Sequence, residues 1–181
     1  MRVLIAAIAV WGLGCAGASS NAPATDFVSS DGPLFDHAVD LVDAPVIVEG
    51  EWSGAFERRV GRADLIAMVR VDSLSSDLVK RRSGYRIAVR VRDRLKGTAS
   101  SEITLRVRDD QPGYQSVRAN EERLLHDPFV VFVKWEAEAG SSELTAHWHL
   151  SPDSAAVRDK IEFFLRHPVR DSHTEVEVVE P

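Results

Sequence analysis

The chain has 181 residues, of which 44% are hydrophobic and 28% charged, and its formal net charge is −6. This composition is typical of a folded globular protein and excludes a wholly disordered, collagen-like or multi-span membrane protein. The single cysteine excludes a disulfide framework and a cysteine-rich zinc module, and the negative net charge argues against a chain-wide attraction to nucleic acid or to an anionic bilayer.

The N-terminus has the layout of a signal peptide. Arg2 is followed by an apolar stretch over residues 3–13, and small residues come next. This stretch of 11 residues is shorter than the ~20 that cross a bilayer and falls within the ~7–15 of a signal-peptide core. We therefore expect residues 1–14 to be removed as a signal peptide. An ordinary secretory signal, cleaved near an unmodified Cys15, is the alternative.

The sequence Gly12-Leu13-Gly14-Cys15 resembles the lipobox of bacterial lipoproteins. The resemblance implies that Cys15 becomes the first residue of the mature chain and carries the acyl groups that anchor it, since two or more acyl chains hold a protein firmly in a membrane. An Asp after the cysteine commonly signals inner-membrane retention in this family, and Ala16 stands there instead. The resemblance thus implies a cell-envelope location at the outer membrane. Residues 15–44 are expected to form a lipid-anchored flexible tether.

The body of the chain, residues 45–168, shows the apolar and polar alternation of β-strands. The clearest case is residues 85–95, where Ile87, Val89 and Val91 alternate with arginines at a period of two. Expected strands cover residues 45–52, 64–73, 85–95, 103–108, 129–135 and 144–150. The stretch 129–135 is almost continuously apolar and is expected to be buried on both sides. We predict a mainly β fold, a small five- to six-stranded OB-like barrel.

Helices are expected at both ends of this body. Ser53 is suited to cap a short N-terminal helix over residues 54–60. A C-terminal helix is predicted with Ser151 as its N-cap and Pro152 at its first position. It carries an apolar stripe, and it ends at His167, before Pro168. The stripe consists of Val157, Ile161, Phe164 and Leu165. Residues 169–181 are expected to form an acidic tail.

The pattern over residues 63–71, 85–97, 103–105 and 128–132 resembles the bacterial relatives of netrin-like and tissue-inhibitor-of-metalloproteinase domains, which are OB-type barrels. Animal inhibitors of this kind chelate the target's zinc through a disulfide-linked N-terminal cysteine. Here the only cysteine is expected to carry lipid, so inhibition by that route is not implied. Inhibition or regulation of an extracellular protease by another route is an alternative function.

Six arginines are expected to share one face of the predicted sheet. Strand parity places three of them on one side of residues 85–95, two on the matching side of residues 103–108, and one nearby on residues 64–73. They are Arg70, Arg86, Arg90, Arg92, Arg106 and Arg108. Such a face suits an anionic partner of the envelope, an acidic glycan or phosphate group, and not nucleic acid. The alternative is a solvated strand face whose arginines pair with nearby carboxylates.

His147 and His149 are one residue apart, so on a strand both side chains point to the same side, with Trp148 turned inward. They could supply two metal ligands, although no third ligand is identifiable, and a metal-dependent enzyme is a second alternative function. Outward polar positions are the simpler interpretation. No nucleophile elbow, phosphate loop or HExxH motif is present in the sequence, and no cofactor is implied. We therefore predict a non-catalytic lipoprotein that binds another envelope protein or an anionic polymer.

Overall fold

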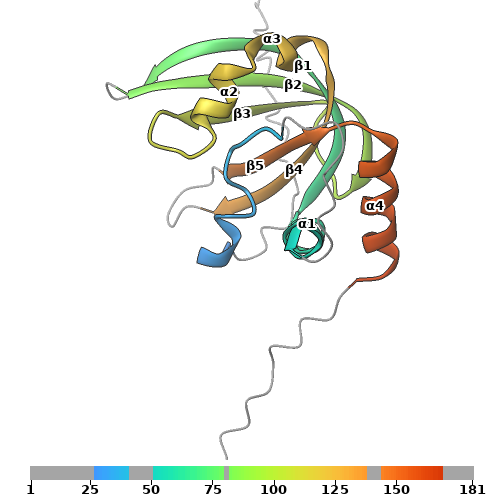
Figure 1. Ribbon diagram of the computed structural model, residues 1–181. Helices are drawn as coiled ribbons and strands as arrows, with labels where there is room; N and C mark the ends of the chain where they lie inside the picture. Colours follow the sequence, from blue (N-terminus) through green and yellow to red (C-terminus); the bar gives the residue numbers. More distant parts are fainter. Residues whose placement is uncertain (1–26, 41–50, 80–81, 138–143, 169–181) are drawn as a thin grey trace, which may run out of the picture.

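The computed structural model describes residues 27–40, 51–79, 82–137 and 144–168, and it is built around a five-stranded antiparallel sheet in the order β3-β2-β1-β4-β5 (Figure 1). The expectation of a mainly β chain is confirmed. The strands are β1 (Leu65–Val79), β2 (Arg82–Lys96), β3 (Glu102–Arg108), β4 (Pro128–Ala137) and β5 (Leu144–Pro152). The signal peptide, Cys15, most of the strand expected at residues 45–52 and the acidic tail lie outside the described residues. Residues 51–52 of that expected strand and the expected cap Ser53 are helical, because the first helix already begins at Glu51.

The main core lies between the inner faces of the strands. Ile87 and Leu105 from β2 and β3 share one buried cluster with Trp148 and Leu150 from β5. Trp148 is fully buried, as its strand parity predicted, and its Nε1 donates a hydrogen bond of 2.9 Å to the backbone oxygen of Arg106. This bond ties β5 to β3, the two strands at opposite ends of the sheet order.

A second core lies on the other face of β4, beneath the helices α1 (Glu51–Arg62) and α4 (Ala155–Arg166). Phe132 of β4 packs there against Phe56 of α1, and their rings meet edge to face at 5.6 Å. The apolar stripe predicted on the C-terminal helix faces this cluster, with Val157 and Ile161 buried. Because both faces of β4 are covered, the prediction that this strand is buried on both sides is confirmed.

The C-terminal helix begins three residues later than predicted. Its N-cap is Ser154, whose side chain accepts a hydrogen bond from the backbone N–H of Val157, whereas Ser151 and Pro152 belong to β5. Pro152 pairs with Phe129 at the end of the β4–β5 ladder. Both serines have a residue type suited to capping, and the strand pairing decides between them. The predicted end of the helix at His167 is confirmed.

Two short helices between β3 and β4 were not predicted: α2 (Tyr114–Ala119) and α3 (Glu121–His126). Each buries one aliphatic side chain in the main core, Val117 from α2 and Leu124 from α3. The segment between β3 and β4 is therefore largely helical. Figure 1 shows these helices beside strands β1 and β2, where they cover one end of the main core.

Residues 27–40, which we call the N-terminal strap, pack against the domain. They begin with a short 3-10 helix, η1 (Ser29–Asp31), and continue along the free edge of β5, where Val39 forms a parallel bridge with Leu150. Phe35 is buried in the second core and Val39 in the main core. These residues fall within the range assigned to a flexible tether from the sequence, and in the structure they form part of the folded body.

Candidate functional site

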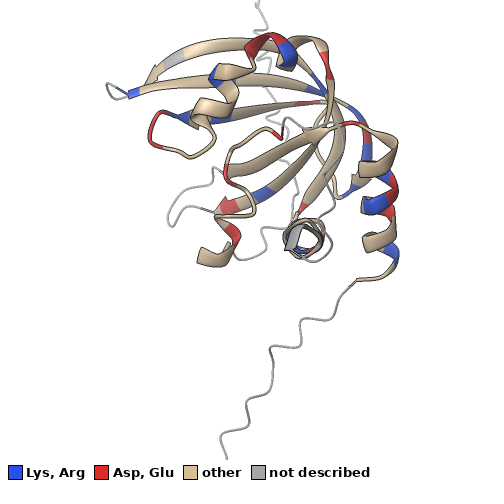
Figure 2. Ribbon diagram, viewed as in Figure 1, with Lys and Arg blue, Asp and Glu red and all other residues tan. Residues whose placement is uncertain are grey.

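The structure brings the six predicted arginines together on one exposed face of β1, β2 and β3, which we call the arginine face. Its members are Arg70, Arg86, Arg90, Arg92, Arg106 and Arg108, and all of them are exposed. Burial alternates along the strands, so that Ile87 and Val89 point into the main core and their neighbours point to solvent. Figure 2 shows these basic positions along β2 and β3, whereas α4 alternates basic and acidic positions.

Two pairs of like charges stand directly opposite each other on neighbouring strands of the arginine face. Arg86 of β2 is paired with Arg106 of β3, and Arg90 of β2 is paired with Arg70 of β1. Like charges in directly opposed positions destabilise an antiparallel sheet. The strand register thus places two pairs of cationic residues side by side on the outer face of the sheet.

The arginine face also carries two acidic side chains, Asp72 and Glu102, at positions beside Arg90. Asp72 accepts a hydrogen bond of 3.0 Å from Nε of Arg90, whose Nη2 also lies 2.8 Å from the same carboxylate oxygen. At the end of β3, Nε of Arg108 lies 3.1 Å from Oδ1 of Asp110, and this hydrogen bond lowers the pKa of Asp110. The face therefore keeps a net positive charge.

Three members of the arginine face stand apart from these ion pairs. Within the described ranges the structure records no ion pair for Arg70, Arg92 or Arg106. The strands fix the backbone positions from which these side chains extend into solvent. An arginine in this state presents a planar set of N–H donors that matches carboxylate and phosphate oxygens.

His147 and His149 lie on the same side of β5, but their surroundings differ. The side chain of His147 is 18% exposed, its Nε2 lies 2.7 Å from Oε2 of Glu136, and its ring stacks on Phe27. His149 is 3% exposed. The interpretation of both histidines as outward polar positions is therefore wrong for His149, because the N-terminal strap covers it.

A metal centre on these histidines finds no support in the described part of the chain, where no group of three or more histidine, cysteine or acidic side chains is arranged to hold an ion. His147 is engaged by Glu136 and His149 by two other carboxylates. The two imidazoles thus belong to separate clusters.

His149 lies at the centre of a buried group that we call the carboxylate–histidine cluster, formed by Asp36, Asp40, Arg59, His149 and Ser151. Nδ1 of His149 lies 2.9 Å from Oδ1 of Asp36. Its Nε2 lies 2.9 Å from Oδ2 of Asp40, outside hydrogen-bond geometry. Oδ2 of Asp40 also accepts a hydrogen bond of 2.8 Å from Ser151 and lies 4.0 Å from the guanidinium of Arg59. The cluster joins the strap to β5 and to α1.

The electrostatics of this cluster favour charged carboxylates. Burial alone would raise the pKa of Asp36 and of Asp40, but the close contact with His149 and its charge, together with hydrogen bonds from the backbone of Ala38 to Asp36 and from Ser151 to Asp40, lower both values. Ser151 is 1% exposed and donates to Asp40, so no substrate reaches its hydroxyl. The arrangement fastens the strap and offers no nucleophile to solvent.

The strap is held by further contacts on either side of this cluster. Arg62 of α1 binds the carboxylate of Asp31 with two hydrogen bonds, of 2.8 and 2.7 Å. Nε of Arg59 donates to the backbone oxygen of Leu34 at 2.7 Å. His37 has a positive φ of 61° and is 6% exposed, and burial lowers its pKa to about 4. The strap is therefore anchored by both charged and apolar groups.

The sequence interpretation did not identify Asp36, Asp40 and Arg59 as members of a cluster. The strap sequence does contain a usable signal, an alternation of residue types. Phe35, His37 and Val39, which are buried in the structure, alternate with positions that include Asp36 and Asp40, which are partly exposed. This period of two is the pattern of a strand with both acids on one side. Their partner on β5 is 113 residues away from Asp36 and has no local signal.

The candidate lipid attachment site, Cys15, lies outside the described residues. In the ranges that are described, no helix has the length and hydrophobicity needed to cross a bilayer. No protein-family model matches the chain, and no curated protein or solved structure matches it either.

Proposed function

We propose that this chain is an envelope lipoprotein, anchored through Cys15 at the outer membrane, whose β-domain binds an anionic polymer without catalysing a reaction. Polymer binding is proposed from one observation, the two cross-strand pairs of arginines. Arg86 lies opposite Arg106, and Arg70 lies opposite Arg90. An anionic ligand that lies across β1, β2 and β3 would reduce the repulsion in both pairs, and each guanidinium can donate two parallel hydrogen bonds to two oxygens of one phosphate or carboxylate group.

The fold supports such a surface. We propose that the sheet is an OB-like barrel: the hydrogen bond from Trp148 to Arg106 joins the two end strands, and α2 and α3 stand between β3 and β4. In this arrangement the inner face is filled by the main core. Only the outer face is free to meet a ligand, and the six arginines are on that face.

Polymer binding is tested with two probes that separate phosphate from carboxylate chemistry: inorganic polyphosphate and polygalacturonate. We expect the Cys15→Ser chain to bind at least one of them at low salt, with an affinity that falls steeply as salt is added. The double variant Arg86→Gln/Arg106→Gln should lose about tenfold or more in affinity, as expected when two charge-assisted contacts are removed.

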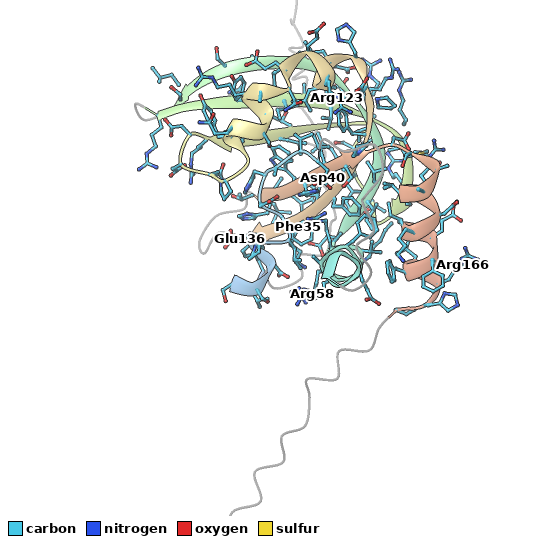
Figure 3. The ribbon with its side chains drawn as sticks, viewed as in Figure 1. Phe35, Asp40, Arg58, Arg123, Glu136 and Arg166 are labelled. Carbon is cyan, nitrogen blue, oxygen red and sulfur yellow. The ribbon has the colours of Figure 1, made fainter. Side chains whose placement is uncertain are left out.

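Two arginines on the helices provide a control variant that removes the same amount of positive charge. Arg58 of α1 and Arg166 of α4 are exposed and lie away from β2 and β3 (Figure 3). The double variant Arg58→Gln/Arg166→Gln should keep its affinity within about twofold if the contact is local and not a response to net charge. Equal losses in both double variants, or no binding of either probe at low salt, would refute the proposed binding surface.

The anchoring half of the proposal has its own test. Replacing Cys15 with Ser should abolish metabolic labelling by fatty acids and move the protein from the membrane to the soluble fraction. Mass spectrometry of the mature N-terminus should find acyl groups on Cys15. An unmodified thiol at this position would refute the anchor and leave the polymer binding to be judged by the assay above.

A further inference from the structure

The arginine face and the start of the strap, residues 27–36, lie on opposite sides of the main core. The inner faces of β2 and β3 meet β5 through Ile87, Leu105 and Trp148, so the outer face of β2 and β3 points away from β5. The start of the strap lies at the other face of β5, where Phe27 stacks on His147 and Asp36 contacts His149. Residues 37–40 run along the free edge of β5 toward α2. Figure 1 agrees, with η1 below β4 and β5 and with β2 and β3 above them.

The first residues of the strap, 27–35, are held against the domain by both aromatic and charged contacts. Phe27 stacks on His147 with ring centroids 4.2 Å apart. Asp31 is 1% exposed and bound by Arg62, and Phe35 is 1% exposed in the second core. Burial would raise the pKa of Asp31, but the hydrogen bonds from Arg62 and Val28 lower it, so the carboxylate stays charged for this contact.

Chain length limits how the domain can turn on its anchor. Only residues 16–26, eleven in number, separate Cys15 from Phe27. Fully extended, they span at most ~40 Å. A domain of this size has a radius of gyration of ~14 Å and is therefore roughly 35–40 Å wide. To lay the arginine face on the anchoring membrane, the eleven residues would have to pass around the whole width of the domain at full extension.

Resting on the proposed function, we propose that the protein is a bridge: the acyl anchor holds the strap side toward the membrane, and the arginine face binds an anionic polymer on the side away from that membrane. The phosphates of the anchoring bilayer are not its ligand. The ligand is a phosphate- or carboxylate-bearing polymer that lies across the surface of the domain, and the protein holds this polymer at about one domain width from the bilayer.

The orientation can be measured by energy transfer from the acylated full chain to an acceptor lipid. Cys15 is the only cysteine and is expected to be acylated, so an introduced cysteine can be labelled alone. Two exposed positions suit the labels: Thr104 on the arginine face, and Ser30 on the strap. In phosphatidylcholine vesicles, transfer from the Ser30→Cys label should exceed transfer from the Thr104→Cys label about twofold or more, because roughly one domain width separates them.

The same measurement distinguishes a polymer from a membrane ligand. Replacing a third of the lipid with phosphatidylglycerol should leave the ratio of the two signals unchanged. A rise of the Thr104→Cys signal to the level of the Ser30→Cys signal, reversed by Arg86→Gln/Arg106→Gln, would overturn the bridge and make the anionic membrane the ligand. Equal signals in phosphatidylcholine alone would also overturn it.

A recruitment assay separates failure of the bridge from failure of the proposed function. Neutral vesicles carrying the acylated protein should carry fluorescent polyphosphate with them on flotation, and the Arg86→Gln/Arg106→Gln protein should lose about tenfold or more of that signal. If the Cys15→Ser chain binds polyphosphate in solution but the vesicles recruit none, the bridge is wrong and the binding surface stands. If neither the Cys15→Ser chain nor the vesicles bind polyphosphate or polygalacturonate, the proposed polymer binding itself is wrong.

Discussion

His149 fastens the N-terminal strap to β5 through Asp36: its Nδ1 lies 2.9 Å from Oδ1 of Asp36, across 113 residues of chain. The strap is therefore held by charge as well as by the burial of Phe35 and Val39. A buried charged group that loses its partner is strongly destabilising, because the remaining charge keeps its desolvation cost without compensation. The stability of the domain should thus depend on this single imidazole.

Replacing His149 with Gln should destabilise the protein by about 3 kcal/mol, since two carboxylates of the strap lose their partner. Urea denaturation followed by tryptophan fluorescence measures this loss as a lower midpoint at an unchanged slope. His126→Gln is the matched control, because His126 is exposed on α3, and its change should stay within about 0.5 kcal/mol. Equal effects of the two variants would contradict the role of the cluster.

The buried His37 makes stability depend on pH. Its pKa is about 4 in the folded protein, lowered first by burial and then by the charge of His147, against an ordinary value of 6.5. Between these values the unfolded chain binds a proton that the folded chain does not, so stability falls as the pH falls from 6.5 toward 4. The loss should reach about 3 kcal/mol at the lower end. Below the ordinary value of 3.8, Asp36 and Asp40 add to this loss, because they take up protons in the unfolded chain while their lowered pKa keeps them charged in the folded one.

The variant His37→Asn tests this assignment, because Asn tolerates the positive φ of this position. Unfolding free energies measured at intervals from pH 7 to pH 4 should show a flatter profile for the variant than for the natural chain. Parallel profiles would mean that other groups titrate over this range.

The strands and the helices α1 and α4 could be predicted from the sequence, whereas α2, α3 and the strap could not. The alternation of Ile87 and Val89 with arginines is a local pattern, so it fixed both the strand and the face on which the arginines lie. The helices α2 and α3 have six residues each and bury one aliphatic side chain apiece, which leaves no stripe for a periodicity to detect.

Local sequence patterns could not predict where the carboxylate–histidine cluster lies. Parity placed His147 and His149 on one side of β5, but their different burial depends on the strap, which reaches β5 from the other end of the chain. The same kind of contact decided the helix start, where pairing of Pro152 with Phe129 keeps Ser151 in the strand. Tertiary contacts of long range overrode the local capping preference in this case.

Two glycine substitutions should have opposite effects. A Cβ at Gly113, beside α2, would lie 1.9 Å from the backbone oxygen of His37, so Gly113→Ala must push the strap away and should cost about 2 kcal/mol or more. A Cβ at Gly54, within α1, would meet nothing within 4 Å, so Gly54→Ala should stabilise by about 0.5–1 kcal/mol. Thermal and urea unfolding compare the two. Loss of protection from hydrogen exchange in residues 37–40 of Gly113→Ala would identify the strap as the part displaced.

A single substitution on the arginine face should have opposite effects on stability and on polymer binding. Arg106→Gln removes a charge that faces Arg86, so the variant should gain a few tenths of a kcal/mol, up to about 0.5, in its free energy of unfolding. The same variant should bind the anionic polymer probe several-fold more weakly. Arg166→Gln removes an equal charge from the end of α4, where Glu162 and the helix dipole favour it, and should lose up to about 0.5 kcal/mol while binding is unchanged. If Arg106→Gln changes stability and leaves binding intact, the arginine face is a solvated strand surface, and the polymer must be sought elsewhere on the domain.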